Sequence, residues 1–122
     1  MVKDKFNEYY TALYKELVKT FPKLQKSTTL SLAPAKLPMM YIRQIGGSAT
    51  IDTLSGTSEF RQIGIEVQFF DKKQSVVRSL ADEAMAYMIE SQLFTCPYAQ
   101  PEDNLENPDV QRFICRFEKT DT

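Results

Sequence analysis

A long alternating strand followed by a strongly apolar helix, over residues 60–93, is the feature that most constrains how this chain can fold. Apolar side chains occupy every second position of residues 63–69, with polar side chains or glycine between them. A period of two is typical of a strand with one face in a core and the other in water. We therefore predict a strand over residues 60–70. Its solvated face is then formed by Gln62, Glu66 and Gln68.

The helix predicted over residues 75–93 is apolar around more than half of its circumference, and such a helix is buried on more than one side. A chain of 122 residues with three or four strands builds only one sheet, which covers one side of the helix. We infer that the second stripe, Met85, Ile89 and Leu93, meets a neighbouring subunit. The alternative is ordinary burial under a loop predicted for residues 95–109.

The first helix is predicted over residues 2–21, where apolar residues recur every three or four positions until Pro22 ends the helix. Tyr14 and Val18 widen its apolar stripe beyond what packing on a single core requires. They suggest a second contact, which we also assign to a subunit interface. The alternative is that the tyrosines border the core with their hydroxyl groups in water.

Two further strands are predicted over residues 39–45 and 110–118, the second with Phe113 and Phe117 on one face. Residues 46–58 are small and hydroxylated, and they form either a long hairpin loop or a short strand followed by a loop. Loops of this length in a compact domain are often binding segments.

Together these elements predict a single α+β domain over residues 1–122, in the order α-β-β(-β)-α-β. Two helices would pack on one face of a small, mostly antiparallel sheet. A strand–helix–strand connection of this length would let the last strand lie beside the first and antiparallel to it, as in split β-α-β folds.

The composition argues against an enzyme. The chain has no histidine, which removes the common nucleophile pairs, the usual zinc ligand and the usual general base. Its few glycines do not follow phosphate-loop spacing, and the acids of the 95–109 loop do not follow the spacing of a calcium loop. We therefore predict no catalytic residue, no cofactor and no metal ion, and we expect Cys96 and Cys115 to be free thiols.

Membrane and sequence-specific nucleic-acid binding are not expected either. No apolar run is long enough to span a bilayer, and the charged start does not resemble a signal peptide. Residues 1–36 hold seven lysines and three acids, a net charge of +4, whereas residues 37–122 carry a net charge of −5. The basic part lacks the arginine cluster of a nucleic-acid reader. It is either a solvated helix face or one half of a complementary docking pair.

The second half of the chain, about residues 59–119, resembles the tail-completion (tail-terminator, or minor capsid) proteins of long-tailed bacteriophages. A strand with a Glu-Val pair and two aromatics leads into a lysine turn, an alanine-containing helix ending in Leu-Phe, a loop with Asn and Pro, and a strand with Arg-Phe pairs. These segments are residues 65–70, 71–73, 79–84, 92–94 and 104–108, with Arg112-Phe113 and Arg116-Phe117. The chain departs from the pattern at Phe70-Asp71, where many members have Tyr-Ser or Tyr-Asn.

The resemblance implies a structural virion protein, usually a homohexameric ring, made in the host cytoplasm and located at the neck between head and tail. It would cap the tail tube, end tube polymerisation and join the tail to a head-side stopper or adaptor protein. DNA would pass through the lumen without sequence-specific binding, and Gln62, Glu66 and Gln68 are the expected lumen-facing residues. Ile51, Leu54 and Thr57 are the expected docking residues for a partner ring. The alternatives are a head-completion or stopper protein of the same neck, or a small monomeric adaptor or inhibitor domain.

Overall fold

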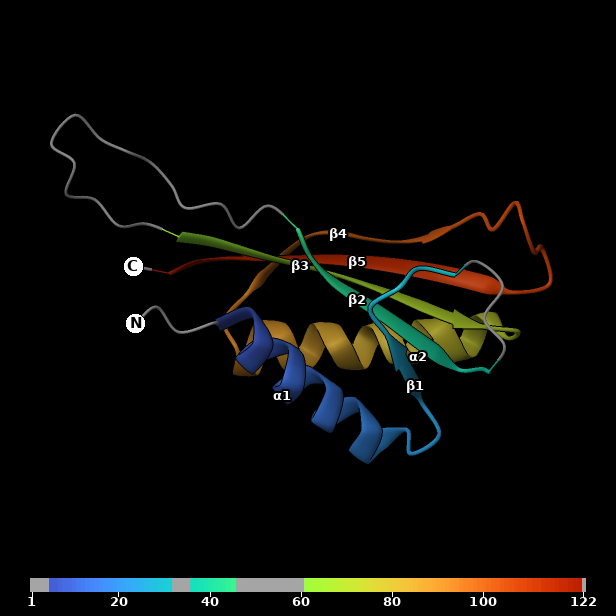
Figure 1. Ribbon diagram of the computed structural model, residues 1–122, viewed down its shortest axis with the longest axis horizontal. Coiled ribbons are helices and arrows are strands. Elements are labelled where there is room, and N and C mark those ends of the chain that lie inside the picture. Colours follow the sequence, from blue (N-terminus) through green and yellow to red (C-terminus); the bar gives the residue numbers. More distant parts are fainter. Residues whose placement is uncertain (1–4, 32–35, 46–60, 122) are drawn as a thin grey trace, which may run out of the picture.

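Two helices cover one face of a five-stranded sheet in the computed structural model, which describes residues 5–31, 36–45 and 61–121 (Figure 1). This arrangement is the predicted α+β class. The elements in chain order are α1 (Lys5–Thr20), β1 (Gln25–Ser27), β2 (Met39–Ile45), β3 (Arg61–Asp71), α2 (Gln74–Ala86), a π-helical turn η1 (Tyr87–Ser91), β4 (Thr95–Glu102) and β5 (Gln111–Asp121).

The strand order is β1-β2-β3-β5-β4, with β1 parallel to β2 and every other pair antiparallel. The prediction that the two strands of the strand–helix–strand connection lie side by side and antiparallel is confirmed, since β5 pairs with β3, while β4 lies on the far side of β5. The reason is the route of the chain after β3. Helix α2 carries it back along the sheet, so that β4 runs in the direction of β3 one position away, and β5 then returns into the gap between them.

The alternation predicted for β3 is confirmed. Ile63, Ile65, Val67 and Phe69 are all buried on the face that the helices cover. The same face of β5 presents Phe113, Cys115 and Phe117, and that of β2 presents Met40 and Ile42. Each fully buried side chain of this size contributes about 1.5–3 kcal/mol relative to exposure, so this row anchors both helices.

The loop predicted for residues 95–109 is wrong over its first half, since Thr95–Glu102 forms the edge strand β4. Strand β5 pairs with β3 along one edge only, and the polar backbone groups of its other edge also require partners, which β4 provides. Pro97 and Pro101 disfavour a strand in the interior of a sheet but are tolerated at an edge. The three-residue strand β1 was not predicted either.

The open face of the sheet is partly covered at one end. Tyr41, Phe70 and Val110 form a small second core there, against which Leu37 and Met39 pack. Among the described residues, both helices pack on the other face, so the middle of the open face is formed by the side chains of the strands themselves.

Candidate functional site

A regular helix was predicted up to residue 93. In the structure α2 instead widens into the π-helical turn η1 before it ends. The backbone N–H of Gln92 donates to the carbonyl of Tyr87 at 3.2 Å, and that of Phe94 donates to Met88 at 2.9 Å. Leu93, between these two donors, has a φ of 61°. A left-handed backbone is unfavourable for a leucine and common for a glycine, and π-helical turns are frequent at functional sites.

Apolar side chains of this helix end face outward. Leu93 is 72% exposed and Ile89 is 42% exposed, whereas Met85 is half-buried against the core. We call Met85, Ile89 and Leu93 the corner patch. The sequence predicted that these three residues form a second apolar stripe, and two of them are indeed exposed on the isolated chain. Whether a neighbouring subunit covers them stays a prediction.

Tyr14 and Val18 are not brought together with the corner patch. Tyr14 is half-buried on the flank of α1 that faces β1, where the Lys26 ammonium lies 4.3 Å from its ring centroid. Helix α2 instead packs over β3 and β5. The extra apolar flank of α1 therefore forms a cation–π contact within the chain, and Val18 is half-buried one turn further on.

The predicted docking residues for a partner ring, Ile51, Leu54 and Thr57, lie outside the described residues, as does the rest of the hairpin region 46–58. Gln62 belongs to strand β3, but its side chain also lies outside what the structure describes.

The expectation that Glu66 and Gln68 are solvated is wrong. Glu66 is 1% exposed, because two arginines of neighbouring strands lie over it. The Arg43 Nε atom donates to Glu66 Oε2 at 2.7 Å, and Arg116 Nε donates to Oε1 at 2.9 Å. Gln68 is buried beside them, donates to Glu66 and accepts a hydrogen bond of 2.9 Å from Arg112 Nε. Alternation tells which residues share a face, but not which long side chains from other strands cover them.

The three arginines were missed as functional residues, although a sequence signal for two of them exists. Arg112 and Arg116 alternate with Phe113 and Phe117, so they belong on the face opposite to the core, which is also the face of Glu66. The sequence does not reveal the register of β3 with its two neighbouring strands, which decides whether these arginines reach Glu66. In the structure Glu66 is directly opposite both Arg43 and Arg116.

The row continues onto the edge strand β4. Tyr98 is opposite Arg116, and its ring lies 4.6 Å from the guanidinium carbon. Burial alone would raise the pKa of Glu66, but the hydrogen bonds from Arg43, Arg116 and Gln68 outweigh it and hold that pKa below the ordinary value. Glu66 is therefore ionised at neutral pH and holds the arginines in place as a charged partner.

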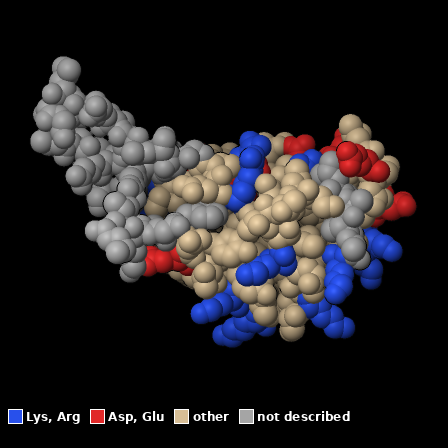
Figure 2. Space-filling model, viewed as in Figure 1, with Lys and Arg blue, Asp and Glu red and all other residues tan. Residues whose placement is uncertain are grey.

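The turn between β4 and β5 carries another exposed apolar side chain, which lies among acids. Leu105 is 87% exposed, and the neighbouring Asp103 and Glu106 are exposed carboxylates. The turn itself is ordered by Asn104, which is buried and accepts a hydrogen bond of 3.2 Å from the backbone of Asn107. In the view of Figure 2, acidic side chains gather at this end of the molecule, while basic side chains lie mostly on the helix side.

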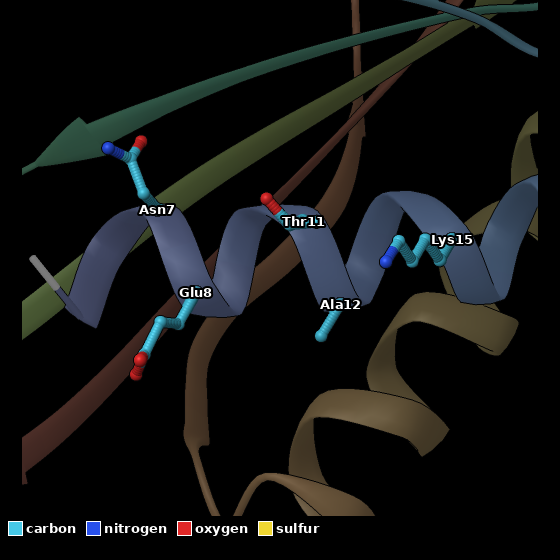
Figure 3. Close-up of a pocket in the computed structure, with 5 residues that line it drawn as sticks. All are labelled: Asn7, Glu8, Thr11, Ala12 and Lys15. Atoms are coloured by element: carbon cyan, nitrogen blue, oxygen red, sulfur yellow. The ribbon is translucent and has the colours of Figure 1, made fainter.

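A shallow depression of about 500 Å³ lies on the outer face of α1 and is lined by Asn7, Glu8, Thr11, Ala12 and Lys15 (Figure 3). Asn7 and Thr11 point to one side of the helix axis and Glu8 and Ala12 to the other. One carboxylate and one ammonium on a helix surface do not form a nucleophile–base pair. The depression has no arrangement of groups that identifies a ligand.

Both cysteines are free, as predicted, and neither is an activated thiol. Cys115 is buried in the core and Cys96 is half-buried. Burial raises the pKa of both thiols. Within the described part of the chain, no three His, Cys, Asp or Glu side chains are placed to hold a metal ion. The described helices include none that is long and apolar enough to cross a membrane.

The sequence matches no protein-family model and no curated protein.

Proposed function

We propose that this protein is a structural tail-completion protein that forms a ring, caps a tail tube and joins it to the head at the neck of a long-tailed phage. The corner patch is the observation that carries the proposal. The resemblance in residues 59–119 and the α+β fold, in which two helices cover one face of a sheet, support it. DNA would pass through the ring without sequence-specific contacts.

The corner patch combines two features that the isolated chain does not favour. Ile89 and Leu93 expose apolar surface, and the backbone at Leu93 adopts a conformation that costs a non-glycine residue about 1–2 kcal/mol. Burying a side chain of this size at a contact contributes about 1.5–3 kcal/mol. An interface to a second copy therefore offsets the cost of the strained turn.

A ring requires each copy to use two different surfaces, since a head-to-tail contact closes into a ring when its rotation allows. The corner patch would provide one of these surfaces. The head-side stopper or adaptor protein and the last ring of tube protein would be the other partners, and the role would be structural rather than catalytic.

Two alternative functions remain open. A head-completion or stopper protein would occupy the same neck and also form a ring, so the corner patch fits it as well. A small adaptor or inhibitor domain would act as a monomer. The exposed Ile89 and Leu93 argue against the monomer in the absence of its target.

The test is the mass of the protein by size-exclusion chromatography with light scattering, alone and mixed with the cognate tail-tube protein. We expect a ring, usually six-fold, alone or only in the mixture. Ile89→Glu should leave folded monomers, because a charge would be buried in the contact. Ser79→Glu, at an exposed position of the same helix, is the matched control and should leave the ring intact. A monomer that ignores the tube protein would favour the adaptor function.

A further inference from the structure

We propose that the arginine-bearing open face of the sheet docks the acidic β4–β5 turn of a second copy of the chain. The inference rests on the proposed function, because it adds to the apolar corner patch an ionic contact between copies. We call Arg43, Arg112 and Arg116 the arginine face, and residues 103–109 the acidic turn.

The guanidinium groups of the arginine face are preorganised to bind an anionic partner. Each of its guanidinium groups donates through Nε to the sheet, Arg43 and Arg116 to Glu66 and Arg112 to Gln68. A guanidinium carries five N–H donors, so its terminal nitrogens can still bind an incoming carboxylate through two parallel hydrogen bonds. The side chains of Arg43 and Arg116 are 51% and 43% exposed. Little side-chain freedom is lost when such a group binds, which favours a specific contact.

The charge of the face favours a carboxylate over a nucleic-acid backbone. Glu66 lies beneath the arginines and neutralises one of their three positive charges. Ile114, between Arg112 and Arg116 on β5, and Tyr41, opposite Gln68 on β2, lie on the same face but are only 5% and 7% exposed. Binding to a nucleic-acid backbone gains from unneutralised positive charge, whereas partly neutralised guanidinium groups suit a partner with a few carboxylates.

The acidic turn is a partner of that composition. Asp103, Glu106 and Asp109 are exposed acids, and Leu105 projects beside them with 87% of its surface in water. The turn is preorganised, since Asn104 is buried at its base and the Val110 N–H donates to the Asn107 carbonyl at 3.0 Å. Its carboxylates would bind the terminal nitrogens of the guanidinium groups.

The contact is between two copies. The acidic turn continues β4 and β5 beyond one end of the sheet, whereas the Arg43–Glu66–Arg116 row lies near the middle of the same sheet (Figure 1). Arg112 is opposite Glu102 at the base of the turn, whereas Arg116 lies further along β5, opposite Tyr98. The surfaces differ, so the contact is head-to-tail, and complementary charge fixes the orientation of neighbouring copies.

Sedimentation equilibrium at low salt tests the contact directly. In Asp103→Lys/Glu106→Lys we expect self-association to weaken by about tenfold or more, and that of the unmodified protein to weaken as salt is added. The control is Asp82→Lys/Glu83→Lys, which changes the net charge equally at exposed positions of α2 and should associate as the unmodified protein does. Equal weakening in both variants, or in neither, overturns the proposal.

A charge exchange identifies the surface that receives the turn. Arg112→Glu removes no partner of Glu66, since Arg112 binds the neutral Gln68. Alone, Arg112→Glu should associate as weakly as Asp103→Lys/Glu106→Lys, and a mixture of the two should recover mixed dimers. Failure to recover them overturns the proposal. So does an Arg112→Glu variant that loses affinity for a short DNA duplex while self-association is unchanged.

Rings that form with the tube protein despite Asp103→Lys/Glu106→Lys would overturn this inference and leave the proposed function intact. If copies associate through the acidic turn but form no ring with the tube protein, this inference stays intact and the proposed function is overturned.

Discussion

Arg43 and Glu66 are directly opposite each other on β2 and β3, and a hydrogen bond of 2.7 Å joins them on the open face of the sheet. Glu66 is the more buried partner and binds Arg116 as well, so one carboxylate ties three strands together. The first prediction concerns its removal. Glu66→Gln should lower the free energy of unfolding by about 1–3 kcal/mol, because a neutral amide cannot accept from both guanidinium groups. Urea denaturation measures this.

Glu83→Gln is the matched control, since Glu83 is exposed on α2 and its change should stay within about 0.5 kcal/mol. If the two variants are equally stable, the hydrogen bonds of Glu66 contribute nothing to the fold.

The second prediction concerns how the stabilisation by Glu66 changes at acidic pH. The pKa of Glu66 is lower in the folded chain than in the unfolded one, so between the two values the unfolded chain binds more protons. Its stabilisation is therefore complete above the unfolded pKa of about 4.3 and is lost as pH falls through the folded value. The stability difference between the unmodified protein and Glu66→Gln should be constant from neutral pH to about pH 5 and shrink below about pH 4. Urea denaturation at a series of pH values measures this stability difference. A difference that stayed constant at low pH would contradict the prediction.

The third prediction separates the fold from assembly at Leu93. Leu93→Gly removes the cost of a left-handed leucine and should raise the free energy of unfolding of the monomer by about 0.5–1 kcal/mol. The same change removes an exposed apolar side chain and should weaken ring formation. Thermal unfolding of the dilute protein and light scattering measure the two effects.

Leu93→Ala is the control for this pair of effects, since it shortens the side chain but retains the left-handed penalty. It should weaken assembly without stabilising the monomer. A Leu93→Gly variant that assembles normally would show that the side chain has no role between copies.

The fourth prediction concerns Gly64, which lies opposite Ile45 on the neighbouring strand. A Cβ atom at this position would lie 2.3 Å from the Ile45 backbone carbonyl oxygen, so β2 and β3 would have to separate there. Gly64→Ala should cost about 1–3 kcal/mol of stability, as overpacking does. Gln100→Ala, on the exposed edge strand, should change stability by no more than about 0.5 kcal/mol in the same denaturation experiment.

Much of the fold was predictable from the sequence because its core strands alternate. The period of two in residues 63–69 gave the correct core face of β3, and strand β2 was predicted within its observed bounds, Met39–Ile45. Elements whose partners dictate their structure were not predictable. Strand β4 contains two prolines and is mostly exposed, and only its pairing with β5 makes it a strand.

In the candidate site, too, features that follow from periodicity could be predicted and features that depend on strand pairing could not. The outward stripe of α2 could be predicted, since helical periodicity places Met85, Ile89 and Leu93 on one side. The burial of Glu66 by two arginines could not be predicted, because it depends on which residues of β2 and β5 lie opposite Glu66 in the sheet. Residues predicted as solvated thus proved to be the buried centre of an ion cluster.

Pro97 and Pro101 have a consequence for how copies of this protein can add to one another. The edge strand β4 lacks a backbone donor at two positions, so another strand cannot bind along its full length. At the opposite edge, β1 has only three residues. Neither edge offers a continuous ladder to another strand, which protects the folded chain against fibril growth. Copies that associate would therefore meet through their side chains and not by extending one another's sheet.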